Sequence, residues 1–308
     1  TGSDFSESGT HGILVYRSVF IALTVSAALP TKFDNNGSYA ILAQQGSRIV
    51  LRERNSISPV VSNGVNGILL EHGSRGDISG VAYSSMTGIA VRATGASILN
   101  AQLCTYSDIG NVCLYATNGS VINAPESVFT GVAAIALADG AEINLNNSTA
   151  SGAITGIAIN SLNGGKVVAI NAVFNNAGSH GINCEGASVY ARNIKLNSAN
   201  GHAVRAVGGF VDVTEATATG ATLNGISASA GSRIIASAAN FAGASGTSGI
   251  SAVTGSHVTA TDCNAQKGGA PNAADVAVSG GGIVAFAGGT GGVNTTANQI
   301  TDLGIIFR

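Results

Sequence analysis

Short runs of aliphatic residues, separated by glycine-rich turns, recur along most of the chain. In the stretch 67–121 an aliphatic run such as Ile89–Val91 is followed, after a short turn, by a second aliphatic position at Ile98. The same pair returns about every 22 residues. Within a run the first and third residues are apolar, as in 135–137 and 157–159, which is typical of a β-strand that buries one face. The pattern therefore predicts short strands rather than helices.

Two series of aliphatic positions keep this period over most of the chain. The first is Ile41, Ile68, Ile89, Val112, Ile135, Ile157, Ile182, Val204, Ile226, Ile250 and Val276. The second is Ile49, Ile98, Val121, Ile143, Val167, Val189, Val211, Ile234, Val258 and Ile283, and the repeat with Gly76 lacks its member. A fixed period of this size indicates a solenoid whose coils stack about 4.8 Å apart. We predict an all-β fold, a right-handed single-stranded parallel β-helix of about eleven coils with both series inside.

The repeat divides the chain into three parts. We assign residues 1–35 to an N-terminal segment with an irregular first coil, 36–287 to the parallel β-helix, and 288–308 to a C-terminal tail. The apolar run 18–29 is shorter than the roughly 20 residues that a membrane span needs, so we expect no membrane insertion. The run also resembles a signal peptide, but the acidic residues ahead of it have the wrong charge for one.

The composition suits thin, closely packed coils. The 308 residues include 43 glycines and no tryptophan, only 10% of them are charged, and the net charge is -2. This balance gives no electrostatic reason to expect nucleic acid as a partner. The cysteines are spaced too irregularly for a zinc motif, so we expect no metal and no cofactor, and we interpret them as reduced residues of a protein made in a cytosol. They are Cys104, Cys113, Cys184 and Cys263.

Candidate chemistry must lie on the outward columns, where stacked coils bring residues from distant positions side by side. In the predicted register Glu71, Arg92 and Tyr115 occupy one outward column in consecutive coils. A carboxylate, a guanidinium and a phenol in a column could bind a sugar and act on it. A solvated ion pair beside an exposed tyrosine is the alternative interpretation.

A second candidate cluster lies in the coils around residue 200. Its members are Glu185, Tyr190, His202, Arg205 and Asp212, with His180 in a neighbouring turn. Glycosidases use two carboxyl groups, and adjacent coils could hold Glu185 and Asp212 on one side as that catalytic pair. A lyase would instead need a base beside a cation that neutralises a uronate, for which His202 and Arg205 are candidates. Tyr190 could stack on a sugar ring, and an ordinary solvated surface is again the alternative.

Coils such as 157–172 and 182–193, together with the ending NTTANQITDLGIIFR, resemble the β-helices of bacteriophage tailspikes and tail fibres of the pectin-lyase-like superfamily. Pectinases and adhesins share the coil pattern, and the resemblance extends over 36–308. It implies a parallel homotrimer in a phage tail, made in the host cytoplasm, that binds and often depolymerises a bacterial surface polysaccharide. A binding fibre without catalysis, and a secreted or surface-bound bacterial adhesin or lyase, remain open alternatives.

The homotrimer is directly testable. After Gly201 the outward residues become small, as at Ser227, Ser251 and Thr259, and the apolar tail 300–307 would be exposed unless it packs on another chain. We expect light scattering to give the mass of a trimer for the full chain, and truncation at Gly288 to weaken that trimer. A stable monomer of the full chain would rule the trimer out.

Overall fold

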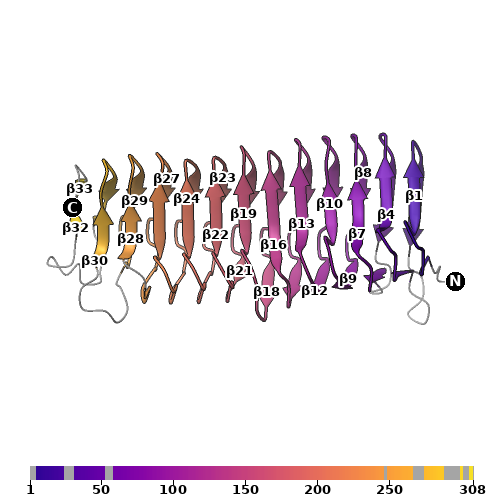
Figure 1. Cartoon of the computed structure of the whole chain (residues 1–308), viewed down its shortest axis with the longest axis horizontal. Helices are drawn as coiled ribbons and strands as arrows, with labels where there is room; N and C mark the ends of the chain where they lie inside the picture. The colour runs from indigo at the N-terminus through magenta and orange to yellow at the C-terminus, as the bar shows by residue number, and fades with distance from the viewer. Residues whose placement is uncertain are drawn as a thin grey trace. The chain divides into compact units, whose positions relative to one another are not determined.

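The computed structural model describes residues 5–23, 31–52, 58–245, 248–265, 274–287, 299–300 and 305–307. Within these ranges the chain forms β-strands, turns and bends, and none of the described residues is helical. The chain divides into two compact units, residues 1–151 and 152–308. Each unit is a stack of coils in which the same sheets are built from successive turns of the chain (Figure 1). The predicted all-β parallel β-helix is confirmed.

In the first unit every coil contributes to three parallel sheets. The first sheet contains β1 (Ile13–Tyr16), β4 (Tyr39–Gln44), β7 (Asn66–Leu70), β10 (Val91–Ala93), β13 (Val112–Thr117) and β16 (Ala134–Asp139). The second contains β2 (Val19–Leu23), β5 (Arg48–Arg52), β8 (Arg75–Asp77), β11 (Ile98–Asn100), β14 (Val121–Asn123) and β17 (Glu142–Asn144). The third contains β3 (Lys32–Asp34), β6 (Val60–Ser62), β9 (Ala82–Met86), β12 (Thr105–Ile109), β15 (Val128–Thr130) and β18 (Thr149–Ser151).

In the second unit two sheets continue this plan. The first contains β19 (Ile159–Leu162), β22 (Ile182–Glu185), β24 (Val204–Val207), β26 (Ile226–Ser229), β28 (Ser248–Ala252), β30 (Ala274–Val278) and β32 (Gln299–Ile300). The second contains β20 (Lys166–Val168), β23 (Ser188–Tyr190), β25 (Phe210–Asp212), β27 (Arg233–Ile235), β29 (His257–Thr259), β31 (Ile283–Ala285) and β33 (Ile305–Phe307). The third side has β21 (Val173–Phe174) and single parallel bridges that run from Val173 to Asn264.

Strands also occur before and after the region 36–287 that the sequence assigns to the β-helix. In the N-terminal segment β1 pairs with β4 and β2 with β5. In the tail β32 pairs with β30 and β33 with β31, while the rest of 288–308 lies outside the described residues.

The register of the first sheet corrects part of the predicted first series. Ile68 pairs with Val91, and Val91 pairs with Leu114. Ile89 lies two residues earlier and is only half-buried. The members at Val112, Ile135 and Ile157 are likewise out of register, since Leu114 pairs with Ala136 in the first unit, and Ile182 pairs with Ile159 in the second. The prediction is confirmed for Ile41, Ile68 and the members from Ile182 to Val276.

The third sheet of the first unit has an aromatic interior that the two series did not include. Tyr83, Tyr106 and Phe129 are register partners on β9, β12 and β15, and each is almost completely buried. Their rings stack with centroids 5.0 Å apart, at interplanar angles of 6° and 9°. Such aromatic pairs contribute about 0.5–1.5 kcal/mol each beyond the burial of their area. This column holds consecutive coils in register along the third sheet.

The second series is wrong at Ile98, Val121 and Ile283, which face outward, while Leu99, Ile122 and Val284 take the interior positions. Gly76, which interrupts the second series, faces the interior between Ile49 and Leu99. A Cβ at this position would collide with Leu99 Cδ1 and would lie 3.0 Å from Leu70 Cδ2. The leucine side chains of neighbouring strands therefore fill the space that the missing aliphatic residue leaves.

We expect Gly76→Val to lower the free energy of unfolding by about 1–3 kcal/mol, because overpacking forces neighbouring side chains out of place. Urea denaturation followed by circular dichroism measures the change. In the double variant with Leu99→Ala the loss should be smaller than the sum of the two single losses. Increased stability of Gly76→Val would show that the interior has room there.

Candidate functional site

The first predicted column is only partly assembled. Arg92 and Tyr115 are register partners on β10 and β13, and the guanidinium carbon lies 5.1 Å from the centre of the tyrosine ring. On its other side Arg92 pairs with Leu69 rather than with Glu71. Glu71 lies just after β7, where its Oε2 accepts a hydrogen bond of 2.7 Å from Gln44 Nε2. The prediction that Glu71 belongs to this column is wrong, because the register of β10 is shifted by two residues from the predicted one.

The second predicted cluster contains a connected network on the outer face of the first sheet of the second unit. Arg205 Nη1 donates 2.6 Å to Asn183 Oδ1 and forms an ion pair with Glu185 Oε1. Asn183 Nδ2 donates to Asn160 Oδ1 at 2.9 Å and to Glu185 Oε1 at 3.3 Å. We call Asn160, Asn183, Glu185 and Arg205 the Arg205 cluster. The charged side chains are 33% exposed for Arg205 and 44% for Glu185, so a ligand can reach both.

Asp212 and Tyr190 lie on a different sheet from Glu185. They are register partners on β25 and β23 of the second sheet. Asp212 is 2% exposed, and its carboxylate accepts hydrogen bonds from Arg192 Nε at 2.7 Å and from the Thr214 hydroxyl at 2.7 Å. Asp212 therefore stabilises the turn after β25, and the expectation that one side of the helix holds both carboxylates is not met.

The charge state of Glu185 also bears on its role. A hydrogen bond from Arg205 lowers the pKa of the Glu185 carboxyl below its ordinary value. A general acid must carry its proton near neutral pH, which requires a raised pKa. Glu185 is therefore an ionised hydrogen-bond acceptor at neutral pH.

His180 and His202 form a ladder at the turn that precedes the first sheet. Their rings stack with centroids 5.2 Å apart. His180 Nδ1 accepts the backbone N–H of His202 at 3.1 Å, and His202 Nδ1 accepts that of Asn224 at 3.1 Å. The amide oxygen of Asn224 then accepts the backbone N–H of Ser248 in the same way. Because each Nδ1 is an acceptor, both imidazoles are neutral with the proton on Nε2.

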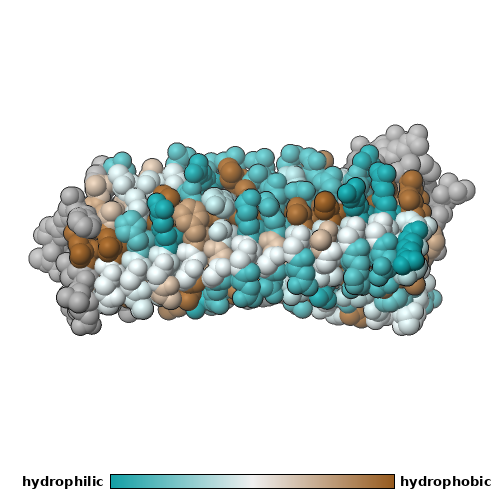
Figure 2. Space-filling model, turned by 90° about the horizontal axis from the view of Figure 1, so that it is seen from above, coloured by the Kyte–Doolittle hydropathy of each residue, from teal (hydrophilic) through white to brown (hydrophobic). Residues whose placement is uncertain are grey.

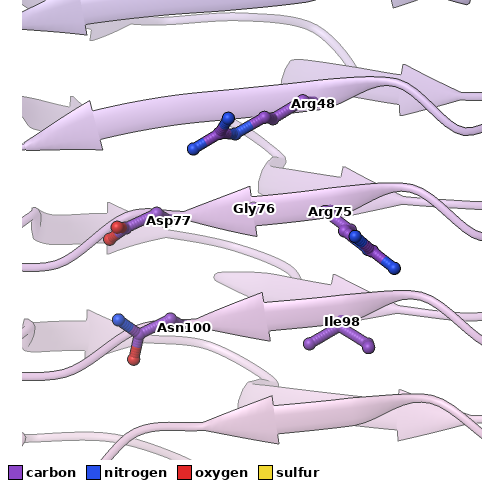
Figure 3. Close-up of a pocket in the computed structure, with 6 residues that line it drawn as sticks. All are labelled: Arg48, Arg75, Gly76, Asp77, Ile98 and Asn100. Carbon is purple, nitrogen blue, oxygen red and sulfur yellow. The ribbon is translucent and has the colours of Figure 1, made fainter.

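A groove in the first unit was not among the predicted sites. It has a volume of about 410 Å³ and crosses the outer face of β5, β8 and β11. Its lining residues are Arg48, Arg75, Gly76, Asp77, Ile98 and Asn100. In Figure 3 Asp77 and Asn100 lie beside each other on adjacent strands, opposite Arg75 and Ile98. The sequence did contain a signal for this groove. The tripeptide Gly-Ser-Arg occurs at 46–48 and again at 73–75, and it places an arginine first in two adjacent strands of the second sheet.

The face drawn in Figure 2 mixes hydrophilic, near-neutral and hydrophobic residues. Figure 2 shows hydrophilic residues in teal over much of the face, with brown hydrophobic residues scattered among them. Within the described ranges no group of three histidine, cysteine, aspartate or glutamate side chains is placed to hold a metal ion. The cysteines are free and buried. None of the described residues belongs to a helix that could cross a membrane.

The histidine ladder predicts a loss of stability in acid. Burial is the largest cause that lowers the pKa of His202, to about 4, followed by the charges of His180 and Arg205. An unfolded histidine titrates near pH 6.5. Below about pH 6.5 the unfolded chain therefore binds more protons, and stability should fall by about 3 kcal/mol as the pH drops toward 4.

Urea denaturation between pH 7 and pH 4 measures this dependence. His202→Asn should reduce it, because asparagine supplies the same acceptor without a titration, as Asn224 does one coil further on. His257→Asn, outside the ladder, serves as the control. An unchanged pH dependence in His202→Asn would contradict the role assigned to His202.

Comparison with known proteins gives a fold but no curated relative. A family model described as a right-handed β-helix region matches residues 30–169, which confirms the predicted hand of the coils. The crystal structure of the periplasmic alginate epimerase AlgG resembles the chain at 10% identity and a TM-score of 0.28, over 94% of this chain and 78% of that one. A likeness at this level carries no argument about function. No curated protein matches the sequence. The conclusion from these comparisons is the right-handed β-helix fold.

Proposed function

We propose that the protein binds a polysaccharide on the outer face of its β-helix, and that the Arg205 cluster is a principal contact. The observation that carries this proposal is the network of a guanidinium, a carboxylate and two side-chain amides on adjacent strands. Such a group offers closely spaced donors and acceptors, and paired hydroxyls of a sugar ring need both. The fold alone would not justify the proposal, because one fold hosts many functions.

The geometry favours binding over hydrolysis. A glycosidase needs two carboxyl groups across the scissile bond, about 5–9.5 Å apart depending on the mechanism. Glu185 lies on the first sheet, whereas Asp212 lies on the second and is already bonded to Arg192 and Thr214. Glu185 is also ionised by its contact with Arg205, which suits an acceptor better than a general acid.

The lyase alternative meets a different obstacle. A lyase base must take a proton from the sugar, and the predicted candidate was His202 beside Arg205. In both imidazoles of the histidine ladder Nδ1 is engaged by a backbone N–H, so the neutral ring carries its proton on Nε2. Neither nitrogen is then free to accept another proton without breaking the ladder.

The resemblance to phage tailspikes adds a prediction about the ligand and the setting. It suggests a bacterial surface polysaccharide, a homotrimer and a place in the phage tail, with a secreted or cell-surface protein as the alternative. These remain predictions of the resemblance, and the Arg205 cluster supports only the glycan contact.

We expect Arg205→Ala to weaken binding to a recognised bacterial glycan by at least about tenfold, since a lost hydrogen bond to a charged group typically costs about 1.5–3 kcal/mol. Arg192→Ala is the matched control, because it also removes an exposed, ion-paired arginine of the second unit. Titration calorimetry after a screen of capsule and O-antigen preparations provides the affinities.

The same preparations report cleavage through new reducing ends or unsaturated uronate absorbance. We expect neither. Equal binding by Arg205→Ala and the wild type would contradict the proposed contact. Cleavage that Glu185→Gln abolishes would replace binding with depolymerase activity.

A further inference from the structure

The groove over β5, β8 and β11 has two walls of different chemistry. One wall is the outward column of Arg48, Arg75 and Ile98, which are register partners on the three strands. The other wall holds Asp77 and Asn100, also register partners, and the backbone of Gly76 lies between the walls (Figure 3). Arg48 and Arg75 thus start from the same outward column, and in Figure 3 the Arg48 side chain extends toward the Asp77 side while the Arg75 side chain extends toward Ile98.

The two arginines of the first wall are available to a ligand. Both are exposed, and neither has an ion-pair partner among the residues that the structure describes. The carboxylate of Asp77 is already occupied by Arg52, whose Nε donates to Asp77 Oδ2 at 2.8 Å. The Asp77 charge is thus balanced within the protein, and the charges of Arg48 and Arg75 are available to an anionic ligand.

The groove continues into a second hollow. This hollow has a volume of about 360 Å³ and shares Asp77 and Asn100 with the first. Polar groups beyond the shared pair include Ser79 and Gln102. Ser79 already bonds to both shared residues, since its hydroxyl donates to Asp77 Oδ1 at 2.9 Å and accepts from Asn100 Nδ2 at 3.2 Å. The fixed polar wall thus extends past the length of a single small anion.

We propose that this groove binds a sugar residue that carries an oxyanion, with the oxyanion on Arg48 and Arg75 and the sugar hydroxyls on Asp77 and Asn100. The oxyanion can be a carboxylate, a sulfate or a phosphate, because guanidinium groups bind all three through paired N–H donors. The inference deepens the proposed function by naming an acidic glycan as the ligand class. The inference depends on the proposed function only in taking the ligand to be a glycan. It does not depend on the Arg205 cluster, which lies in the other unit.

The second wall explains why a free inorganic anion is a poorer ligand. Asp77 and Asn100 line the same groove with hydrogen-bonding groups that an isolated anion on the arginines leaves unused. A sugar with an acidic group on one edge and hydroxyls on the opposite edge satisfies both walls. This complementarity selects an acidic glycan over a bare ion and over a neutral glycan.

The test uses the full chain and four probes in titration calorimetry at low ionic strength. The probes are polygalacturonate oligosaccharides, the same oligosaccharides with their carboxyl groups reduced, dextran sulfate oligosaccharides, and inorganic sulfate. We expect the acidic oligosaccharides to bind at least about tenfold more tightly than the carboxyl-reduced ones and than inorganic sulfate. The preference between polygalacturonate and dextran sulfate then distinguishes a carboxylate from a sulfate ester.

Variants locate the contact. Arg48→Gln and Arg75→Gln should each weaken binding of the acidic oligosaccharides by about tenfold or more, and should hardly change binding of the carboxyl-reduced ones. Arg233→Gln is the matched control, because Arg233 is also the first residue of a second-sheet strand but lies in the other unit. Thermal unfolding of each variant checks that the fold is intact.

Each outcome is decisive. If the acidic oligosaccharides bind but Arg48→Gln and Arg75→Gln match Arg233→Gln, the groove is not the site and the inference is wrong. If Arg205→Ala alone abolishes that binding, the proposed function stands without the groove. If the groove variants alone abolish it, the groove stands and the Arg205 cluster is not the contact. Failure of the wild type to bind any probe at millimolar concentration would overturn the inference.

Discussion

The parallel pairing of each coil with the next is the constraint on which the rest of the structure depends. A single coil cannot bury its apolar residues, so its stability comes from placing Ile68, Val91 and Leu114 in one column. The same pairing fixes the outward side chains without further choice. Ile49, Gly76 and Leu99 form a column that faces the interior. Arg48 and Arg75 each come one residue earlier on their strands, so they face outward beside the groove. The register between strands therefore determines both the packing of the core and the arrangement of the outward side chains.

The sequence predicts the fold well because the aliphatic runs and the glycine-rich turns return at a nearly constant period. It predicts the register less well, because a shift by two residues keeps the same face of a strand inside. Ile89 and Val91 both satisfy the alternation, and only Val91 pairs with Ile68. That shift is enough to move Arg92 opposite Leu69 and to leave Glu71 outside the column. Errors of this kind leave the fold class unchanged while they rearrange the candidate site.

The remaining differences arise where a coil turns from one sheet to the next. Arg205 and Glu185 were predicted as neighbours and do form an ion pair, because both lie on adjacent strands of the first sheet. Asp212 was placed beside them, yet it ends a strand of the second sheet and bonds to Thr214 in the following turn. Periodicity along the chain does not state which sheet a polar residue faces. The groove was missed for a related reason, since periodicity alone does not state that Arg48 and Arg75 begin adjacent strands of the second sheet.

The central claim is that coil stacking joins distant segments into one surface for an acidic glycan. Hydrogen exchange of the full chain, with and without saturating polygalacturonate oligosaccharide, tests it most directly. The account predicts that backbone amides in 48–52, 75–80 and 98–102 slow together on binding, because these segments line adjacent strands and the turns after them. Slower exchange confined to one contiguous segment, or found only outside these three, would contradict it.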